Sequence, residues 1–215
     1  MSQIQIFISY SSKDKKIAGY IKKNFENRYG FSVFLAHSDI CAASDWEEVI
    51  IDHIKNCDFF LVLLTENYKG SDYTSQEIGM AVAWKKLIIP IKFEDFNPYG
   101  FISKFQAIPC NELTKENVDR VITTIFFLSI NDGSYKKYRE KAIDSLIVGL
   151  SKSTSFAETC YFVRILNKID SLTGTQIKAI SKVVKTNGQV GWEGFEVPAF
   201  KKKIFAEYKI DLDSL

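Results

Sequence analysis

The stretch GSDYTSQEIGMAVAWKK, residues 70–86, places a glutamate, Glu77, among apolar residues with helical spacing. A carboxylate held in this way can stabilise positive charge that develops on a bound ligand. A structural role competes with this interpretation. Thr74-Ser75-Gln76-Glu77 has the spacing of a capping box, and a carboxylate in the first turn is stabilised by the helix dipole. The stretch alone favours the cap, so other parts of the chain must decide between the two roles.

A second group of polar residues, Ser9-Tyr10-Ser11-Ser12-Lys13-Asp14, directly follows an alternating apolar segment near the N-terminus. Its hydroxyls, backbone amides and lysine are groups that can hold sugars and phosphates. The chain has no G-x-G-x-x-G segment, which excludes a Rossmann dinucleotide site. A plain helix cap explains the same residues equally well, and one loop can serve both purposes.

The elements that must position these residues alternate along the first 128 positions. Short apolar runs predict strands, and amphipathic spacing predicts helices, one of which contains Glu77. Gly30 is placed to end the first helix. The run 58–65 is apolar without a break from Phe59 to Leu64, as in a strand that is buried on both faces. The expected strands are 3–9, 31–36, 58–65, 86–93 and 105–108, and the other expected helices are 13–30, 46–57 and 114–128.

Strand–helix alternation predicts a parallel sheet with helices on both faces and right-handed crossovers. Five short strands fit a flavodoxin-like α/β fold with strand order 2-1-3-4-5. In this order a ligand crevice opens beyond the carboxyl ends of strands 1 and 3. We therefore expect Glu77 and the loop at 9–14 to lie beside the same cleft.

The strand pattern stops near residue 129. We predict a first domain over 1–128, a linker over 129–134 and a small helical C-terminal domain over 135–215. Three amphipathic helices are expected in this domain, before a turn-rich segment at 187–200 and a short terminal helix over 201–210. The domain shows no catalytic grouping of residues, and its role is left open.

Composition limits the class of protein. A net charge of +2 argues against a nucleic-acid partner. Four separated cysteines and two histidines make a zinc site improbable, so no metal is expected and reduced thiols suit a cytoplasmic protein. The N-terminus lacks the apolar core of a signal peptide, and no apolar run approaches the roughly 18 residues that span a bilayer. We expect no membrane partner.

Three segments in order, FISYSSKD (7–14), FLAHSDICAASDWEEVIIDHIKNCDFFLVLLTENY (34–68) and SDYTSQEIGMAVAWKKLIIPIKF (71–93), resemble a TIR (Toll/interleukin-1 receptor) domain. The resemblance covers about 60% of the chain. It implies self-association through TIR–TIR contacts. His37, Ser38 and Asp39 fall on the loop that in this family borders the active site and mediates assembly. Cys41-Ala42-Ala43-Ser44 stands where a glycine is usual in that loop, which is a departure from the family pattern.

The resemblance also implies an activity, because many bacterial TIR domains cleave the nicotinamide–ribose bond of NAD⁺. Their functional glutamate lies in an S-x-[WY]-x-x-x-E pattern, which Ser71, Tyr73 and Glu77 match here. This makes Glu77 the catalytic candidate and Tyr73 its aromatic partner. The expected substrate-binding residues are Ser9, Tyr10, Ser11, Lys13, His37, Asp39 and Tyr73.

One carboxylate can suffice for this chemistry. The ribose gains positive charge as the bond breaks, and nicotinamide leaves as a neutral molecule, so no general acid is required. NAD⁺ is then a substrate and no cofactor is expected. A downstream effector that reads an ADP-ribose-type signal, linear or cyclic, is an expected partner in bacterial immunity. For Trp46, a packing role is favoured over ligand contact.

Two alternatives remain. In one, the chain is a non-enzymatic TIR scaffold that acts through TIR–TIR and C-terminal-domain contacts, and Glu77 is a cap. In the other, the cleft is kept but the substrate changes, as in nucleoside-processing enzymes of similar topology.

Overall fold

The computed structural model describes residues 2–36, 46–93, 95–131, 137–191, 196–212 and 214. The chain divides into two compact units. The first, called the α/β unit below, contains Ile4–Glu26 and Phe31–Leu128. The second, the helical unit, contains Met1–Gln3, Asn27–Gly30 and Ser129–Leu215. Two short N-terminal segments thus belong with the helices of the C-terminal part.

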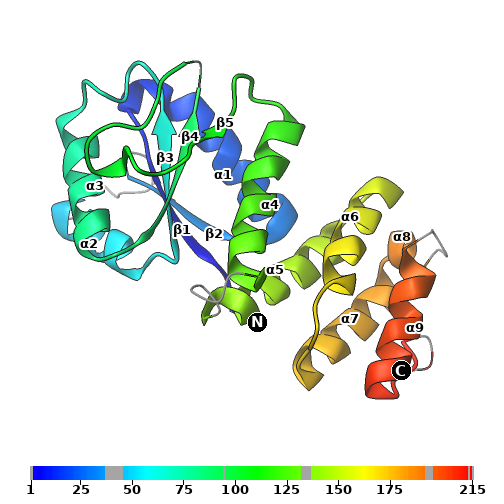
Figure 1. Ribbon diagram of the computed structural model, residues 1–215. Coiled ribbons are helices and arrows are strands. Elements are labelled where there is room, and N and C mark those ends of the chain that lie inside the picture. The colour runs from blue at the N-terminus through cyan, green and yellow to red at the C-terminus, as the bar shows by residue number, and fades with distance from the viewer. Residues whose placement is uncertain are drawn as a thin grey trace. The chain divides into compact units, whose positions relative to one another are not determined.

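The α/β unit is built on one five-stranded sheet in which every neighbouring pair is parallel. The strand order is β2-β1-β3-β4-β5, which confirms the predicted order 2-1-3-4-5 (Figure 1). The central strand β3 is buried at all of its positions, as its unbroken apolar run predicts. The strands are β1 (Gln5–Ser9), β2 (Ser32–Leu35), β3 (Phe59–Leu64), β4 (Leu87–Lys92) and β5 (Ile108–Pro109).

Helices cover both faces of this sheet. In Figure 1, α2 and α3 lie on one face, and α1 and α4 lie on the other. Strand residues alternate between the two faces, so Phe7, Phe60 and Val62 pack toward α2 and α3. The helices are α1 (Lys15–Tyr29), α2 (Trp46–Asn56), α3 (Asp72–Ala83) and α4 (Lys115–Asn131), with short 3₁₀ turns η1 (Ser12–Asp14) and η2 (Gly100–Ile102).

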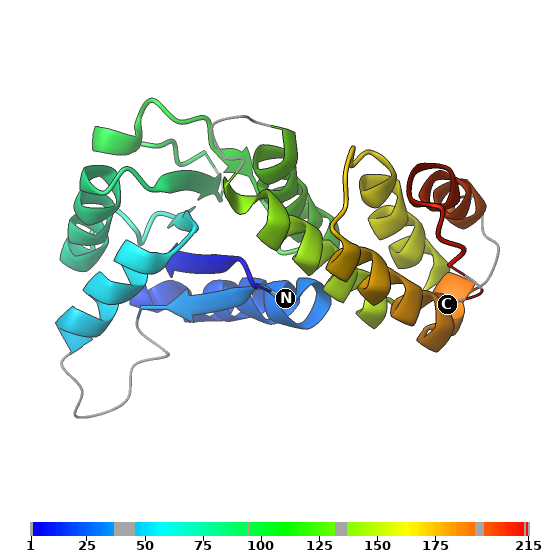
Figure 2. The same cartoon turned by 90° about the horizontal axis from the view of Figure 1, so that it is seen from below.

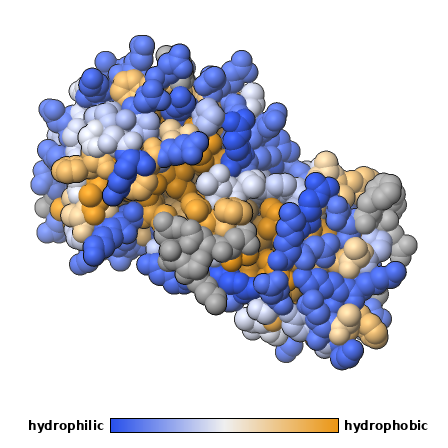
Figure 3. All heavy atoms as spheres, viewed as in Figure 1, coloured by the Kyte–Doolittle hydropathy of each residue, from blue (hydrophilic) through white to orange (hydrophobic). Residues whose placement is uncertain are grey.

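The connection between β4 and β5 has no long helix in its described part. Its only helical element there is η2, where Ile102 enters the core beside α3. Partly buried apolar side chains from this connection and from α3 pack around that core. Figure 3 shows apolar residues gathered on this side of the unit.

The ends of two helices, α1 and α4, can be compared with their predicted positions. Helix α1 ends at Tyr29, and Gly30 has φ +65°, so the predicted stop at this glycine is confirmed. Helix α4, in contrast, continues through Asn131, so residues 129–131 of the predicted linker are helical. Apolar residues of α4 repeat at helical spacing up to the end of the helix, and this explains why it does not stop at 128. Residues 132–134 lie outside the described residues.

The helical unit contains α5 to α9. Helix α5 packs against both α6 and α7, and α6 packs against α9 (Figures 1 and 2). The segment 187–200, predicted as turns, contains a short helix and the start of the last helix, which begins four residues earlier than predicted, with a proline in its first turn. The helices are α5 (Arg139–Lys152), α6 (Phe156–Asn167), α7 (Gly174–Thr186), α8 (Gly188–Gly191) and α9 (Val197–Tyr208).

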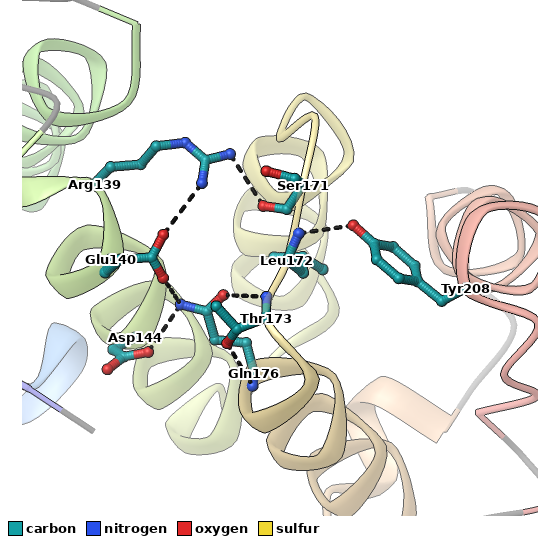
Figure 4. A network of polar contacts seen from close by, with 8 residues as sticks. All are labelled: Arg139, Glu140, Asp144, Ser171, Leu172, Thr173, Gln176 and Tyr208. Atoms are coloured by element: carbon teal, nitrogen blue, oxygen red, sulfur yellow. Dashed lines mark hydrogen bonds and ion pairs between the residues drawn. The ribbon is translucent and has the colours of Figure 1, made fainter.

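A polar network ties α5 to the start of α7 (Figure 4). The side-chain amide of Gln176 donates to Glu140 over 2.9 Å and to Asp144 over 3.1 Å. Its carbonyl oxygen accepts from the N–H of Thr173, which completes a capping box at the start of α7. The phenol oxygen of Tyr208 on α9 accepts a hydrogen bond of 2.7 Å from the backbone N–H of Leu172, just before α7. The buried amide of Gln176 and the buried carboxylate of Asp144 are thereby paired, and the exposed carboxylate of Glu140 joins them at the surface.

None of the helices in the described part of the chain is both long enough and apolar enough to cross a membrane.

Candidate functional site

The helix that carries Glu77 begins earlier than the sequence predicts. Helix α3 starts at Asp72 with Ser71 as its N-cap residue, and the Ser71 side chain makes no capping hydrogen bond. Thr74 lies inside the helix, where its hydroxyl donates to the carbonyl of Ser71 over 2.8 Å. The predicted capping box from Thr74 to Glu77 is therefore wrong. Glu77 lies in the second turn, too far from the free backbone amides to cap them.

Glu77 is instead a buried carboxylate that faces the end of β1. It is only 2% exposed, and its Oε2 accepts a hydrogen bond of 2.5 Å from the hydroxyl of Ser9. The Ser9 hydroxyl also lies 2.7 Å from the phenol oxygen of Tyr68. The other carboxylate oxygen, Oε1, is buried and has no hydrogen-bond partner among the described residues. A buried acceptor without a partner is costly and marks a position that a ligand can satisfy.

Burial controls the charge of this carboxyl group. Removal from water raises the pKa of Glu77 from 4.5 to about 7, against the hydrogen bond from Ser9, which lowers it. Burial also raises the pKa of Tyr68 well above 10, so this phenol stays protonated. A carboxyl group whose pKa lies near neutrality is a common feature of active sites.

Glu77 lines a pocket of about 180 Å³ between α2 and α3. The mouth of this pocket carries two aromatic residues, Trp46 and Tyr73, whose rings meet edge to face with centroids 5.1 Å apart. Both rings are partly exposed, Trp46 by 38% and Tyr73 by 45%. The remaining lining residues are Glu47, Ile50, Ile51, Gln76 and Met80. The pocket thus combines one buried carboxylate with aromatic and aliphatic walls.

A second, more polar pocket of about 370 Å³ adjoins the first, because Tyr73 lines both. Lys13 and the N-terminal residues Ser71 and Asp72 of the α3 region contribute to it. Without a side-chain cap, the first amides of α3 have partial positive charge available to an anion. Its other lining residues are Ser11, Ser12, Glu66, Asn67 and Gly70.

Asp14 joins the two loops that border these pockets. Its carboxylate accepts hydrogen bonds from Thr65 over 2.6 Å and from Asn67 over 2.9 Å. Thr65 and Asn67 follow β3, whereas Asp14 follows β1. The loops at the carboxyl ends of the two central strands are therefore held together at the switch point of the sheet, as the topology predicts.

The structure brings some of the predicted site residues to the pockets and buries others in the core. Tyr73, Ser11 and Lys13 line the pockets, and Ser9 contacts Glu77 from within the core. Tyr10 is fully buried, and it is not among the residues that line the two pockets beside Glu77. His37 and Asp39 lie outside the described residues.

Sequence reasoning did not include Trp46 or Tyr68 in the candidate site, although Trp46 lines the pocket and Tyr68 contacts Ser9. A tryptophan at the start of a helix resembles a packing anchor, and only the approach of α3 places it at the pocket. Tyr68 lies in an irregular segment after β3 that gives no periodic signal. No group of three or more His, Cys, Asp or Glu residues that could hold a metal ion occurs in the part of the chain that the structure describes.

Comparisons with known proteins identify a family for the α/β part of the chain. The family described as TIR domain matches residues 6–122. Among solved structures, the TIR domain of the Toll-related receptor TRR-2 from Hydra magnipapillata is 17% identical, with a TM-score of 0.49, and the match covers 60% of this chain and 100% of that chain. The CMP N-glycosidase BcmB from Clostridium botulinum is 22% identical, with a TM-score of 0.40, and the match covers 54% and 96%. The search of curated proteins found no significant match.

The family match covers more than half of the chain and contains all of the sheet except Gln5, together with Glu77 and Tyr73. The chain belongs to the TIR domain family.

Proposed function

We propose that this TIR domain cleaves the nicotinamide–ribose bond of NAD⁺ with Glu77 as the catalytic residue. The observation that carries the proposal is the state of this carboxylate. It is buried at the wall of a pocket, one oxygen is held by Ser9, and the other has no partner among the described residues. The match of Ser71, Tyr73 and Glu77 to the pattern of enzymatic TIR domains supports the same assignment.

In this proposal the two pockets bind different parts of NAD⁺. The aromatic walls provided by Trp46 and Tyr73 suit the flat nicotinamide ring, and Glu77 faces the adjoining ribose. The pyrophosphate occupies the polar pocket, where Lys13 and the first amides of α3 offer positive charge. Together the pockets fall within the roughly 300–1,000 Å³ that is usual for small-molecule sites.

The reaction needs no proton donor for the leaving group. The C–N bond breaks with its electrons passing to the pyridinium ring, and nicotinamide leaves as a neutral molecule. The ionised carboxylate of Glu77 stabilises the positive charge that develops on the ribose. Water then adds to the ribose and loses a proton, which gives ADP-ribose. If a ring nitrogen of the adenine adds instead, the product is a cyclic ADP-ribose.

The test is release of nicotinamide from NAD⁺ by the purified protein, followed by chromatography, with and without a crowding agent that promotes self-association. Glu77→Gln keeps the shape of the side chain but removes its charge, and we expect it to abolish release. Glu116→Gln, an exposed glutamate on α4, is the matched control and should retain full activity. Circular dichroism of both variants checks that the fold is intact.

The outcomes separate the candidate functions. Full activity of Glu77→Gln would remove this residue from the mechanism. No nicotinamide from the wild type under either condition would favour a scaffold that acts through TIR–TIR contacts. Free nucleosides assayed in parallel identify a different substrate for the same cleft. The chromatogram also distinguishes linear from cyclic products.

A further inference from the structure

We propose that Tyr68 and Ser9 are positioning residues that form a directed hydrogen-bond relay, Tyr68 to Ser9 to Glu77, and that this relay holds the carboxylate ionised for its work. The inference rests on the proposed function of Glu77 and concerns how that site is regulated by its surroundings.

The direction of the relay follows from the number of hydrogens available. The Ser9 hydroxyl has one hydrogen, and its distance of 2.5 Å to Oε2 of Glu77 is that of a hydroxyl that donates to a charged carboxylate. Its hydrogen is thereby used, so the contact of 2.7 Å with Tyr68 requires the phenol to donate to Ser9. Each donation polarises the next hydroxyl, which strengthens the bond that reaches the carboxylate.

Tyr68 is held in place independently of Glu77. Its side chain is fully buried in the core between the sheet and α3. Its backbone N–H donates to the carbonyl of Thr65 over 3.1 Å, and its carbonyl accepts from the hydroxyl of Thr74 over 3.1 Å. The phenol is therefore a fixed donor, and it remains protonated because burial raises its pKa.

The relay acts on one oxygen and leaves the other available. Oε2 is bound to Ser9, whereas Oε1 has no partner among the described residues. Hydrogen bonds to the ionised form oppose the effect of burial, which by itself favours the neutral acid. Without the relay, a carboxyl group this deeply buried would remain protonated at higher pH and could not stabilise positive charge.

Other titratable groups lie near Glu77 and Tyr68, and a test of the relay must leave them unchanged. Glu47 on α2 and Tyr73 on α3 line the pocket beside Glu77. Tyr99, which precedes η2, lies close enough to influence Tyr68. The phenol oxygen of Tyr99 is buried without a hydrogen-bond partner among the described residues, so it provides a matched control hydroxyl outside the relay.

The experiment titrates Glu77 directly in the full chain, so it does not depend on any activity. Protein with ¹³C at the glutamate side-chain carboxyl carbon is followed by NMR from pH 5 to 9, and the Glu77→Gln spectrum identifies the Glu77 signal. We expect Ser9→Ala to shift the midpoint upward by about one pH unit, the value of one net hydrogen bond. Tyr68→Phe should shift it in the same direction by less, and Tyr99→Phe should leave it unchanged.

A double variant distinguishes loss of the relay from a folding defect caused by an unpaired buried hydroxyl. Ser9→Ala leaves the Tyr68 hydroxyl buried without its acceptor, whereas Ser9→Ala with Tyr68→Phe leaves no unpaired hydroxyl. Because Tyr68 acts through Ser9, the double variant should titrate like Ser9→Ala alone. Midpoints equal to wild type in Tyr68→Phe and in the double variant would overturn the relay and reduce these residues to packing.

The relay and the proposed function fail separately. If the midpoints move but no nicotinamide is released by the wild type, the relay holds and the NAD⁺ proposal fails. If nicotinamide is released but the midpoints do not move, the NAD⁺ proposal holds and the relay fails. Where both proposals hold, the Ser9→Ala and Tyr68→Phe variants should lose kcat at acid pH with a midpoint that shifts as the NMR midpoint does. Their KM should stay the same.

Discussion

The rings of Trp46 and Tyr73 meet edge to face, with centroids 5.1 Å apart, although they come from different helices. The contact joins the start of α2 to the first turn of α3 at the mouth of the Glu77 pocket. Edge-to-face pairs are worth about 0.5–1.5 kcal/mol beyond the area they bury. Both rings nevertheless keep exposed surface, which we interpret, in the proposed function, as surface for a further flat ring.

Replacement of Trp46 by alanine tests this interpretation of the pair. In a Glu77→Gln background, where NAD⁺ should stay intact, we expect Trp46→Ala to weaken NAD⁺ binding about tenfold, which corresponds to about 1.4 kcal/mol. Calorimetry measures the affinity. Trp84→Ala is the control, because Trp84 is similarly exposed at the other end of α3 and does not line the pocket. Equal losses in the two variants would contradict a role for Trp46 in binding.

Glu77 should make the stability of the protein depend on pH in a defined direction. Its pKa is about 7 in the folded chain against 4.5 for the free group, so the folded state binds a proton that the unfolded state has lost. The free energy of unfolding therefore falls as pH rises from 4.5 to about 7 and levels off above that.

The measurement compares urea unfolding of the wild type and Glu77→Gln at several pH values. The glutamine carries no charge, so this variant should become the more stable protein as pH rises. The difference should be near zero at pH 4.5 and reach at most about 3 kcal/mol above pH 7. Parallel curves across this range would mean that burial does not raise the pKa of Glu77.

Replacement by alanine should change the free energy of unfolding in opposite directions at Gly19, within α1, and at Gly30, directly after it. Gly30 has φ +65°, and an added Cβ would lie 2.5 Å from Cγ1 of Val148. We expect Gly30→Ala to lower the free energy of unfolding by at least about 1–2 kcal/mol from the backbone alone. Gly19 lies inside the helix, and an added Cβ would meet no atom within 4 Å apart from its chain neighbours and the backbone of its own helix, so Gly19→Ala should stabilise by about 0.5–1 kcal/mol. Chemical denaturation compares the two, and a similar effect at both positions would rule out this explanation.

Gln176 should be essential to the stability of the helical unit. Its amide donates to two carboxylates one turn apart on α5, and its carbonyl oxygen takes part in the capping box of α7. Gln176→Ala leaves Glu140 and Asp144 without this donor, and we expect a loss of about 2–3 kcal/mol. Thermal unfolding provides the measurement. Lys178→Ala, an exposed position on the same helix, should change little, and a loss there as large as at Gln176 would argue against the network.

The residue pattern alone was sufficient for the sheet and its strand order. The run 58–65 is apolar at nearly every position, and such a run flanked by amphipathic helices has few stable arrangements other than a parallel sheet covered on both faces. The topology in turn placed Glu77 and the loop at 9–14 at the same crevice. The capping box failed because short-range spacing does not distinguish a first turn from a second.

The chemical environment of Glu77 was decided only by the tertiary structure. Ser9 and Glu77 are separated by 68 positions, and Ser9 and Tyr68 by 59, so no local pattern relates them. Burial and hydrogen bonding depend on every element that packs around a side chain, whereas periodicity depends on neighbours a few residues away. The sequence by itself determined which carboxylate reaches the crevice, and packing decided that it is buried, held at one oxygen and close to neutral pKa.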